Sequence, residues 1–187
     1  MDFNRINQEL KVDNLFLKPI SANDSTFING MFNDTELKKY YIVPKEVQQD
    51  HKRLVDYWLN DIRNGVGTCW IIFKKGKGIF YNDKQVGFIA FGFRNTHKNA
   101  IISYAILPEY RRKGFATTSV KLVIERLKQE RVESVEADID RDNFSSEKVV
   151  EKLGFIANKR NALVDPEIMR DGEIRIRALW KKELIEF

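Results

Sequence analysis

The sequence predicts an α/β fold in which helices cover both faces of one mixed sheet. The first observation is the order of hydrophobic periods, which gives a strand, two helices, three strands, a helix, a strand, a helix and two strands. The second is that short turns join the three central strands, whereas helices separate the later ones, so antiparallel and parallel pairs are both expected. The third is that Gln85–Arg94 is apolar on both faces, as a central strand requires.

The N-terminal part predicts an arm, an outer strand and a short helix. Residues 1–13 are polar, and Leu15–Ile20 has the composition of a strand whose proline marks an edge or a strand end. Ser21 with Asp24 three residues later is a capping pair, so a helix is expected to run to about residue 33.

A longer helix is predicted to begin at Pro44 and to end at Gly65, with a polar-aromatic loop containing Tyr40 and Tyr41 before it. Its core positions repeat at the helical period and are Val47, His51, Leu54, Val55, Trp58 and Ile62. The later elements are strands at 68–74, 85–94, 100–107, 134–140, 155–164 and 173–180, and helices at 115–130 and from Asn143. Because no repeat or linker interrupts this order, we expect one domain over residues 1–187.

Composition limits the class of protein and its partners. The net charge is +5 and the pI about 9.2, but seven Lys/Arg against three Glu lie between residues 109 and 131. This local surplus favours a small anion over a nucleic-acid partner. Cys69 is the only cysteine and the two histidines lie far apart, so neither a disulfide nor a metal site is expected. With no signal peptide and no membrane-spanning run, we expect a cytoplasmic protein without a membrane partner.

The segment Ile106–Thr117 predicts a phosphate-binding turn between a strand and a helix. Its three consecutive cations Arg111, Arg112 and Lys113 precede Gly114. A helix start has unpaired N–H groups and a partial positive charge, and a glycine lets a large anion approach them. The alternative is a basic turn in which the glycine serves only the backbone geometry.

Arg111–Ala116 matches [Q/R]-x-x-G-x-[G/A], which resembles the acyl-CoA pyrophosphate signature of the GNAT N-acetyltransferase superfamily. Leu15–Asp24, Gln85–Ile89, Ser103–Pro108 and Asn143–Phe155 resemble, in the same order, segments of the Rim-type branch, which acetylates protein N-termini and related amines. The resemblance implies a mostly antiparallel sheet of about seven strands, with splayed fourth and fifth strands. It also implies acetyl-CoA as the acyl donor.

The resemblance also implies which residues bind the donor. Backbone groups near Ile106 and Leu107 would bond the pantetheine amides and polarise the thioester, and Asn143 would contact pantetheine across the gap. Main-chain amides from Arg112 to Thr117 would hold the pyrophosphate. The full predicted donor set is Ile106, Leu107, Arg111, Arg112, Lys113, Gly114, Phe115, Ala116, Thr117, Asn143 and Ser146.

The catalytic residues follow the branch less closely. Val150 stands where many relatives have a tyrosine acid, so Ser146, the serine of Asn-x-x-Ser, is the candidate acid. Ile101 stands where many have a glutamate base. Asp165 and Glu167 are candidate bases instead, with Asp138 as a further choice.

For the acceptor, position in this fold points to Tyr40 and Tyr41, and to Asp138 if the acidic face of its strand meets the pocket. A solvated strand face explains Asp138 equally well.

The predicted function is transfer of an acetyl group from acetyl-CoA to a primary amine, a protein N-terminus or a small molecule, by direct attack. The missing tyrosine and glutamate leave open a non-catalytic acyl-CoA-binding sensor. A nucleic-acid-binding domain is a third class, but no motif supports it. A monomer or a homodimer is expected.

Overall fold

The structure is a computed structural model that describes residues 2–43, 47, 50–76, 82–94, 96–157, 167–168 and 174–185. Its main sheet has eight strands in the order β1-β2-β3-β4-β5-β6-β10-β7, and β8 pairs with β9 separately. The strands are β1 (Leu10–Val12), β2 (Leu15–Pro19), β3 (Gly67–Lys74), β4 (Lys84–Phe93), β5 (Asn99–Ile106), β6 (Ser134–Asp140), β7 (Ile156–Ala157), β8 (Glu167–Ile168), β9 (Ile174–Arg175) and β10 (Arg177–Glu183). The helices are α1 (Phe3–Ile6), α2 (Ser25–Met31), α3 (Thr35–Tyr40), α4 (Arg53–Asn64), α5 (Phe115–Gln129) and α6 (Phe144–Lys152).

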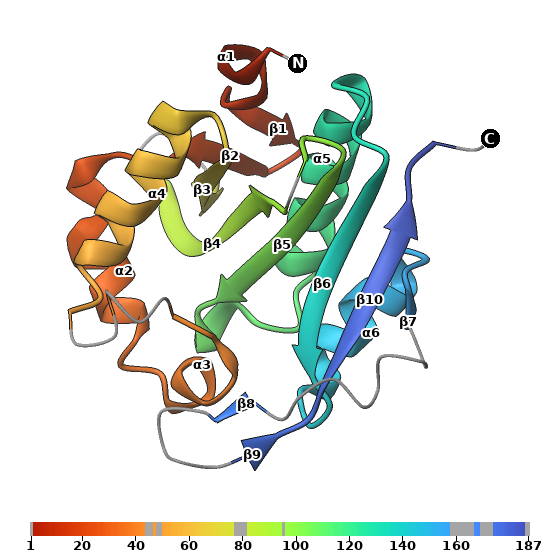
Figure 1. Cartoon of the computed structure of the whole chain (residues 1–187). Coiled ribbons are helices and arrows are strands. Elements are labelled where there is room, and N and C mark those ends of the chain that lie inside the picture. Colours follow the sequence, from red (N-terminus) through yellow and green to blue (C-terminus); the bar gives the residue numbers. More distant parts are fainter. Residues whose placement is uncertain are drawn as a thin grey trace.

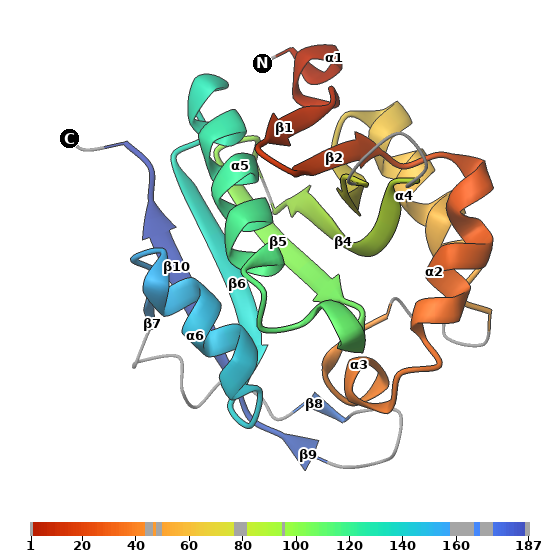
Figure 2. The same cartoon turned by 180° about the vertical axis from the view of Figure 1, so that it is seen from behind.

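Helices lie on both faces of the main sheet, as predicted. Figure 1 shows α2 and α4 on one side, and Figure 2, from behind, shows α5 and α6 on the other. Each helix buries its apolar stripe against the strands: α5 contributes Val120 and Leu127 to one core, and α4 contributes Leu54 and Trp58 to the other. Within the described residues, no helix is long and apolar enough to cross a membrane.

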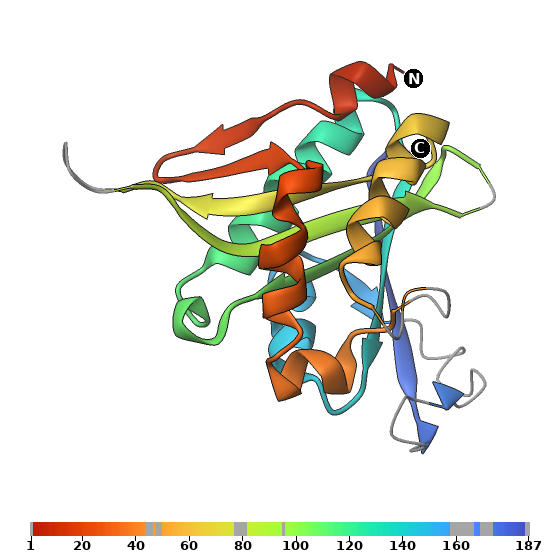
Figure 3. The same cartoon turned by 90° about the vertical axis from the view of Figure 1, so that its left-hand side faces the viewer.

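Strands β5 and β6 form the parallel pair of this otherwise antiparallel sheet, and they separate soon after they meet. Their ladder runs only from Asn99↔Ser134 to Ile101↔Glu136, although β5 continues to Ile106 and β6 to Asp140. The edge-on view in Figure 3 shows the two strands diverging. The predicted splayed strands are therefore confirmed, within a sheet of eight strands rather than about seven.

The predicted start of the long helix is wrong. Helix α4 begins at Arg53, and Pro44 lies outside the described residues. The Asp50 side chain accepts the backbone N–H of Lys52 at 3.0 Å, so a local turn takes the place of a helical turn there. The predicted aromatic loop is also partly helical, because Asp34 caps α3 by accepting the N–H of Glu36.

The N-terminal arm packs onto the sheet. Ile6 and Leu10 are buried, and β1 pairs with β2, so β2 is not an edge strand and Pro19 marks only its end. The capping pair Ser21–Asp24 and the cap at Asn143 form as predicted. Of the predicted strand 155–164 the structure describes residues 155–157, and β7 lies among them. Strands β9 and β10 cover the region of the predicted strand 173–180.

Candidate active site

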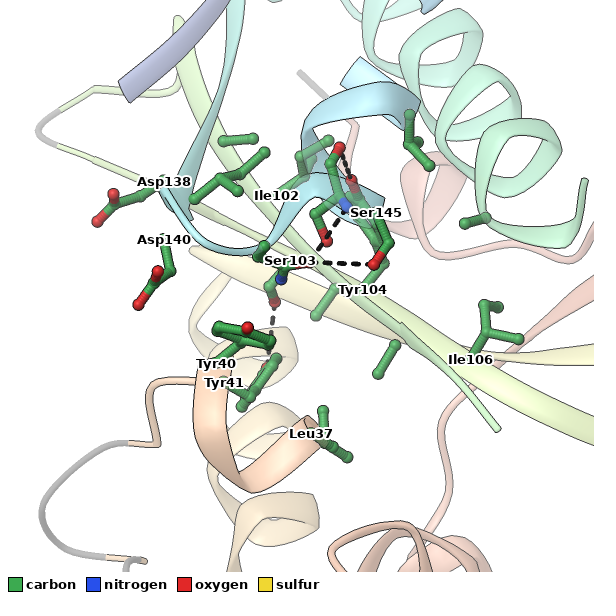
Figure 4. Close-up of a pocket in the computed structure, with 18 of the residues that line it drawn as sticks. Leu37, Tyr40, Tyr41, Ile102, Ser103, Tyr104, Ile106, Asp138, Asp140 and Ser145 are labelled. Atoms are coloured by element: carbon green, nitrogen blue, oxygen red, sulfur yellow. Dashed lines mark hydrogen bonds between the residues drawn. The ribbon is translucent and has the colours of Figure 1, made fainter. Parts of the chain in front are cut away.

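One pocket of about 1100 Å³ joins the gap between β5 and β6 to the segments that follow them. Its walls come from α3, α4, the middle of β5, the start of α5, the end of β6 and the start of α6. Figure 4 shows labelled side chains from α3, β5, β6 and α6 around one space. The pocket therefore contains parts of the chain that the sequence analysis assigned separately to a donor and to an acceptor.

The turn before α5 has the backbone geometry of an anion site. Gly114 is the N-cap of α5 with a φ of +83°, a conformation that glycine adopts without strain. The first helical bond runs from the Thr118 N–H to the Gly114 carbonyl at 2.9 Å, so the N–H groups of Phe115, Ala116 and Thr117 precede the helical ladder. A Cβ at Gly114 would meet nothing within 4 Å. The amides thus lie beside open space.

The two neighbouring cations of the turn differ in orientation. Arg112 is exposed and lines the pocket together with Gly114–Thr117. The Lys113 ammonium donates to the Glu109 carbonyl at 2.6 Å and lies 5.6 Å from the Tyr110 ring centre. Both charges stay close to the start of α5, where they add to the helix dipole.

Arg111 bonds to the protein itself. Its Nε donates to the Ile106 carbonyl at 3.0 Å, and its two terminal nitrogens pair with Asp34 and Glu36 of the α3 region. Its guanidinium thus lies between the end of β5 and α3, and Arg111 also lines the pocket. Its predicted contact with the phosphates stays a prediction.

The edge of β5 that faces the gap carries backbone groups that β6 does not bond, although the Ile106 carbonyl already accepts the Arg111 Nε–H. The Leu107 N–H donates to the Val86 carbonyl at 2.8 Å, so Leu107 bonds toward β4. Because bonding direction alternates along a strand, the polar backbone groups of Tyr104 and Ile106 point toward β6. Beyond Ile101 no β6 residue pairs with that edge. An extended chain with amide groups could add to it.

Asn143 and Ser146 lie on the other side of the gap, at the start of α6. The Asn143 Oδ1 accepts the Ser146 N–H at 3.2 Å, which caps the helix and fixes its first turn. Ser146 is half-buried and lines the pocket. The predicted pair is thus brought to one wall.

Tyr104 is a pocket residue that the sequence analysis missed. Its hydroxyl crosses from β5 and donates to the Ser146 carbonyl at 3.1 Å. Burial raises the pKa of Tyr104, an effect that hydrogen bonding to Ser146 opposes, so the phenol stays protonated at neutral pH. The sequence did contain a signal for it. Tyr104 lies two positions from Ile102 and from Ile106, so its ring shares their face of the strand while its hydroxyl adds a polar tip.

Tyr40, Tyr41 and Asp138 line the part of the pocket near α3. Tyr41 and Ser103 share a hydroxyl hydrogen bond at 3.1 Å, and burial raises the pKa of Tyr41. The Tyr40 hydroxyl donates to the Asp142 carbonyl at 3.3 Å. The Arg177 Nε lies 3.2 Å from the Asp138 carboxylate, so a cation of the protein already neutralises this acid. Figure 4 shows Asp138 on the strand above the two tyrosines.

The remaining candidate bases are not placed by the structure. Asp165 lies outside the described residues, and for Glu167 only the backbone is described, in β8. The wall supplied by α4, which contributes Tyr57, Trp58 and Asp61, was not predicted from the sequence. Its helical period predicted burial for Trp58 but gave no signal for a neighbouring carboxylate.

Comparison with known proteins identifies the family. Residues 14–156 match the model of the acetyltransferase (GNAT) domain. An uncharacterised N-acetyltransferase of Bacillus subtilis, YjdG, is 35% identical over 101 residues, which span 50% of this chain and 54% of that one. The match thus spans about half the length of this curated relative.

Two solved structures have the same fold. One is RimL, a ribosomal L7/L12 alpha-N-protein acetyltransferase in complex with coenzyme A, with a TM-score of 0.77 at 15% identity over 94% of this chain and 97% of that one. The other is the spermidine N-acetyltransferase of Vibrio cholerae with CoA and spermine, with a TM-score of 0.74 at 16% identity over 91% and 96%. The predicted superfamily is confirmed: the chain belongs to the GNAT acetyltransferase family.

Proposed function

We propose that this protein transfers an acetyl group from acetyl-CoA to a primary amine by direct attack of the amine on the thioester. The observation that carries the proposal is that one continuous pocket links the start of α5 to the open edge of β5 and then to the aromatic wall of α3. Membership of the GNAT family supports acyl transfer. The relatives that act on a protein N-terminus and on spermidine support an amine acceptor.

The donor half of the pocket suits an acyl-CoA in charge and in length. Phosphates would bind the amides of Phe115–Thr117, with Arg112 and Lys113 nearby. The arm from the phosphate to the sulfur has about thirteen bonds, which at a strand's rise corresponds to roughly 15 Å or about four residues. Counted back from Ile106, the sulfur would lie level with Ile102, next to the point where β5 and β6 part.

The reaction needs two proton movements. The acceptor must lose a proton to attack, and the departing thiolate must gain one. Ser146 remains our candidate acid because its helical turn lines the pocket beside the Tyr104 phenol. Asp165 and Glu167 remain candidate bases. Asp138 is the weaker choice, because Arg177 already compensates its charge.

Calorimetry with two donors tests the phosphate contacts. Acetyl-CoA is expected to bind at least about a hundredfold more tightly than S-acetyl-pantetheine, which lacks the phosphates and the nucleotide, since each charge-assisted hydrogen bond contributes about 1.5–3 kcal/mol. Thiol release with a panel of primary amines then tests transfer. Equal, weak binding of both donors would contradict the phosphate site.

Replacement of Ser146 by alanine separates catalysis from binding. We expect kcat to fall about a hundredfold and the Kd for acetyl-CoA to change far less, because the hydroxyl is one of many predicted donor contacts whereas loss of a general acid slows the chemical step. The comparison variant is Tyr104→Phe, which removes the hydrogen bond to the Ser146 carbonyl but leaves the serine hydroxyl. A larger loss in Tyr104→Phe would make the phenol the acid.

The sensor remains the second candidate function because Val150, in the place of the tyrosine acid, is fully buried. A sensor would bind CoA tightly and release no thiol with any amine. The Ser146→Ala substitution would leave this behaviour unchanged. For the location we propose the cytoplasm, since the one cysteine, Cys69, is a free and fully buried thiol that suits a reducing compartment.

A further inference from the structure

Among the described residues, four carboxylates line the pocket, and the protein neutralises or bonds three of them. They are Glu36, Asp61, Asp138 and Asp140. Glu36 pairs with Arg111 and Asp138 with Arg177, while the Asp140 Oδ1 accepts the Asp142 N–H at 2.9 Å. Across the part of the chain that the structure describes, no ion pair and no side-chain hydrogen bond involves Asp61.

Asp61 lies beside β3, at the level along the sheet where the gap between β5 and β6 closes. It belongs to the last turn of α4 and is half-buried. A Cβ on Gly67 would lie 3.4 Å from its Oδ2, and Gly67 pairs with Gly92, which in turn pairs with Ile101. Ile101 is the residue at which the ladder between β5 and β6 ends. The carboxylate therefore stands near the level at which a thioester would reach from the donor half.

The surface beside Asp61 is aromatic and leaves room. Tyr57 and Trp58 of the same helix line the pocket, and Tyr57 is 42% exposed. A Cβ at Gly92 would meet only one neighbouring atom, at 4.0 Å, so the floor of this region is open. An apolar or aromatic group can pack there, and an aromatic face also attracts a cation.

The charge balance of this region favours a cationic ligand. Burial raises the pKa of Asp61, and no opposing cause acts on it. A partly desolvated carboxylate without a cation is less stable than one with a partner, so a bound ammonium group supplies the missing charge. A bound ammonium group would stabilise the other acids of the pocket less, because the protein already compensates or bonds them.

We propose that Asp61 binds the ammonium group of the acceptor, whose adjoining apolar or aromatic group packs against Tyr57 and Trp58. The acceptor class is then a primary amine with such a group and without a carboxylate next to the amine. This inference rests on the proposed function, because it places the acceptor in the pocket that also holds the donor. It concerns binding before transfer and not the proton steps.

Calorimetry with two matched probes tests the inference. Phenylalaninamide and phenylalanine share the ring and the amine, but only phenylalanine carries a carboxylate. We expect phenylalaninamide to bind the protein–CoA complex saturably, and phenylalanine to bind at least about tenfold more weakly, because its carboxylate would face Asp61. In Asp61→Asn the affinity for phenylalaninamide is expected to fall about tenfold or more, and the difference between the probes to shrink.

Asp56→Asn is the matched control, since Asp56 lies on the same helix, is exposed and does not line the pocket. It is expected to bind both probes as the wild type does. Three results would overturn the inference: no saturable binding of phenylalaninamide, equal affinity for the two probes, or an unchanged affinity in Asp61→Asn.

A CoA titration of the same samples separates this inference from the proposed function. Normal CoA binding with no effect of Asp61→Asn refutes the role of Asp61 alone. If CoA does not bind the wild type, the proposed function fails, and the probes are titrated into the free protein and judged by the same criteria.

Discussion

Replacement of Gly114 by leucine is expected to weaken acetyl-CoA binding about a hundredfold or more. The new side chain would extend into the open space beside the amides of Phe115–Thr117 and would keep the phosphates from them. Loss of one or two charge-assisted hydrogen bonds, each worth about 1.5–3 kcal/mol, accounts for a change of this size. Isothermal titration calorimetry with acetyl-CoA measures it.

A second glycine separates this effect from backbone strain. Gly65 also has a positive φ, +66°, at the end of α4, and a Cβ there would make only ordinary contact with Phe3. Gly65→Ala is expected to cost about 1–2 kcal/mol of stability from strain, with no change in affinity for acetyl-CoA. If Gly114→Leu bound acetyl-CoA normally, phosphates would not dock at this turn.

Replacement of Gly87 by alanine is expected to lower the free energy of unfolding by about 3 kcal/mol, near the upper end for overpacking. A Cβ on Gly87 would lie 2.2 Å from the Ala105 carbonyl oxygen and 3.1 Å from the Ile106 Cα, so β4 and β5 must move apart. In a chain of this length the loss corresponds to a fall in Tm of roughly 10 °C. Thermal and urea denaturation measure both quantities.

Gly30 provides the control for this change. It lies in α2, and a Cβ there would meet nothing within 4 Å. Gly30→Ala is expected to leave stability unchanged or to raise it by about 0.5–1 kcal/mol, because alanine loses less backbone entropy in a helix. A Gly87→Ala variant as stable as the wild type would show that the two strands can separate without cost.

The sequence predicted features that depend on neighbouring residues. The turn at Gly114 and the cap at Asn143 are encoded within a few positions, and both form. The parting of β5 and β6 was predicted only through resemblance, because no local pattern encodes where two distant strands stop pairing.

The sequence could not predict which charges pair. Arg111 bonds to Asp34, 77 positions away, and Tyr104 reaches Ser146, 42 positions away. Such contacts depend on how the chain returns to the pocket. For the same reason Asp61, on a helix predicted only for its apolar stripe, gave no sign of a role.

The slot between β5 and β6 lies between two main chains whose ladder ends at Ile101↔Glu136. Residues of the wall formed by α3 and α4, which includes Tyr40 and Tyr57, can therefore be exchanged one at a time without closing the slot between the strands. A scaffold of this kind can keep one acyl donor while its amine selectivity is altered by substitution. On the acceptor placement proposed above, the wall formed by α3 and α4 is the place at which to alter amine selectivity.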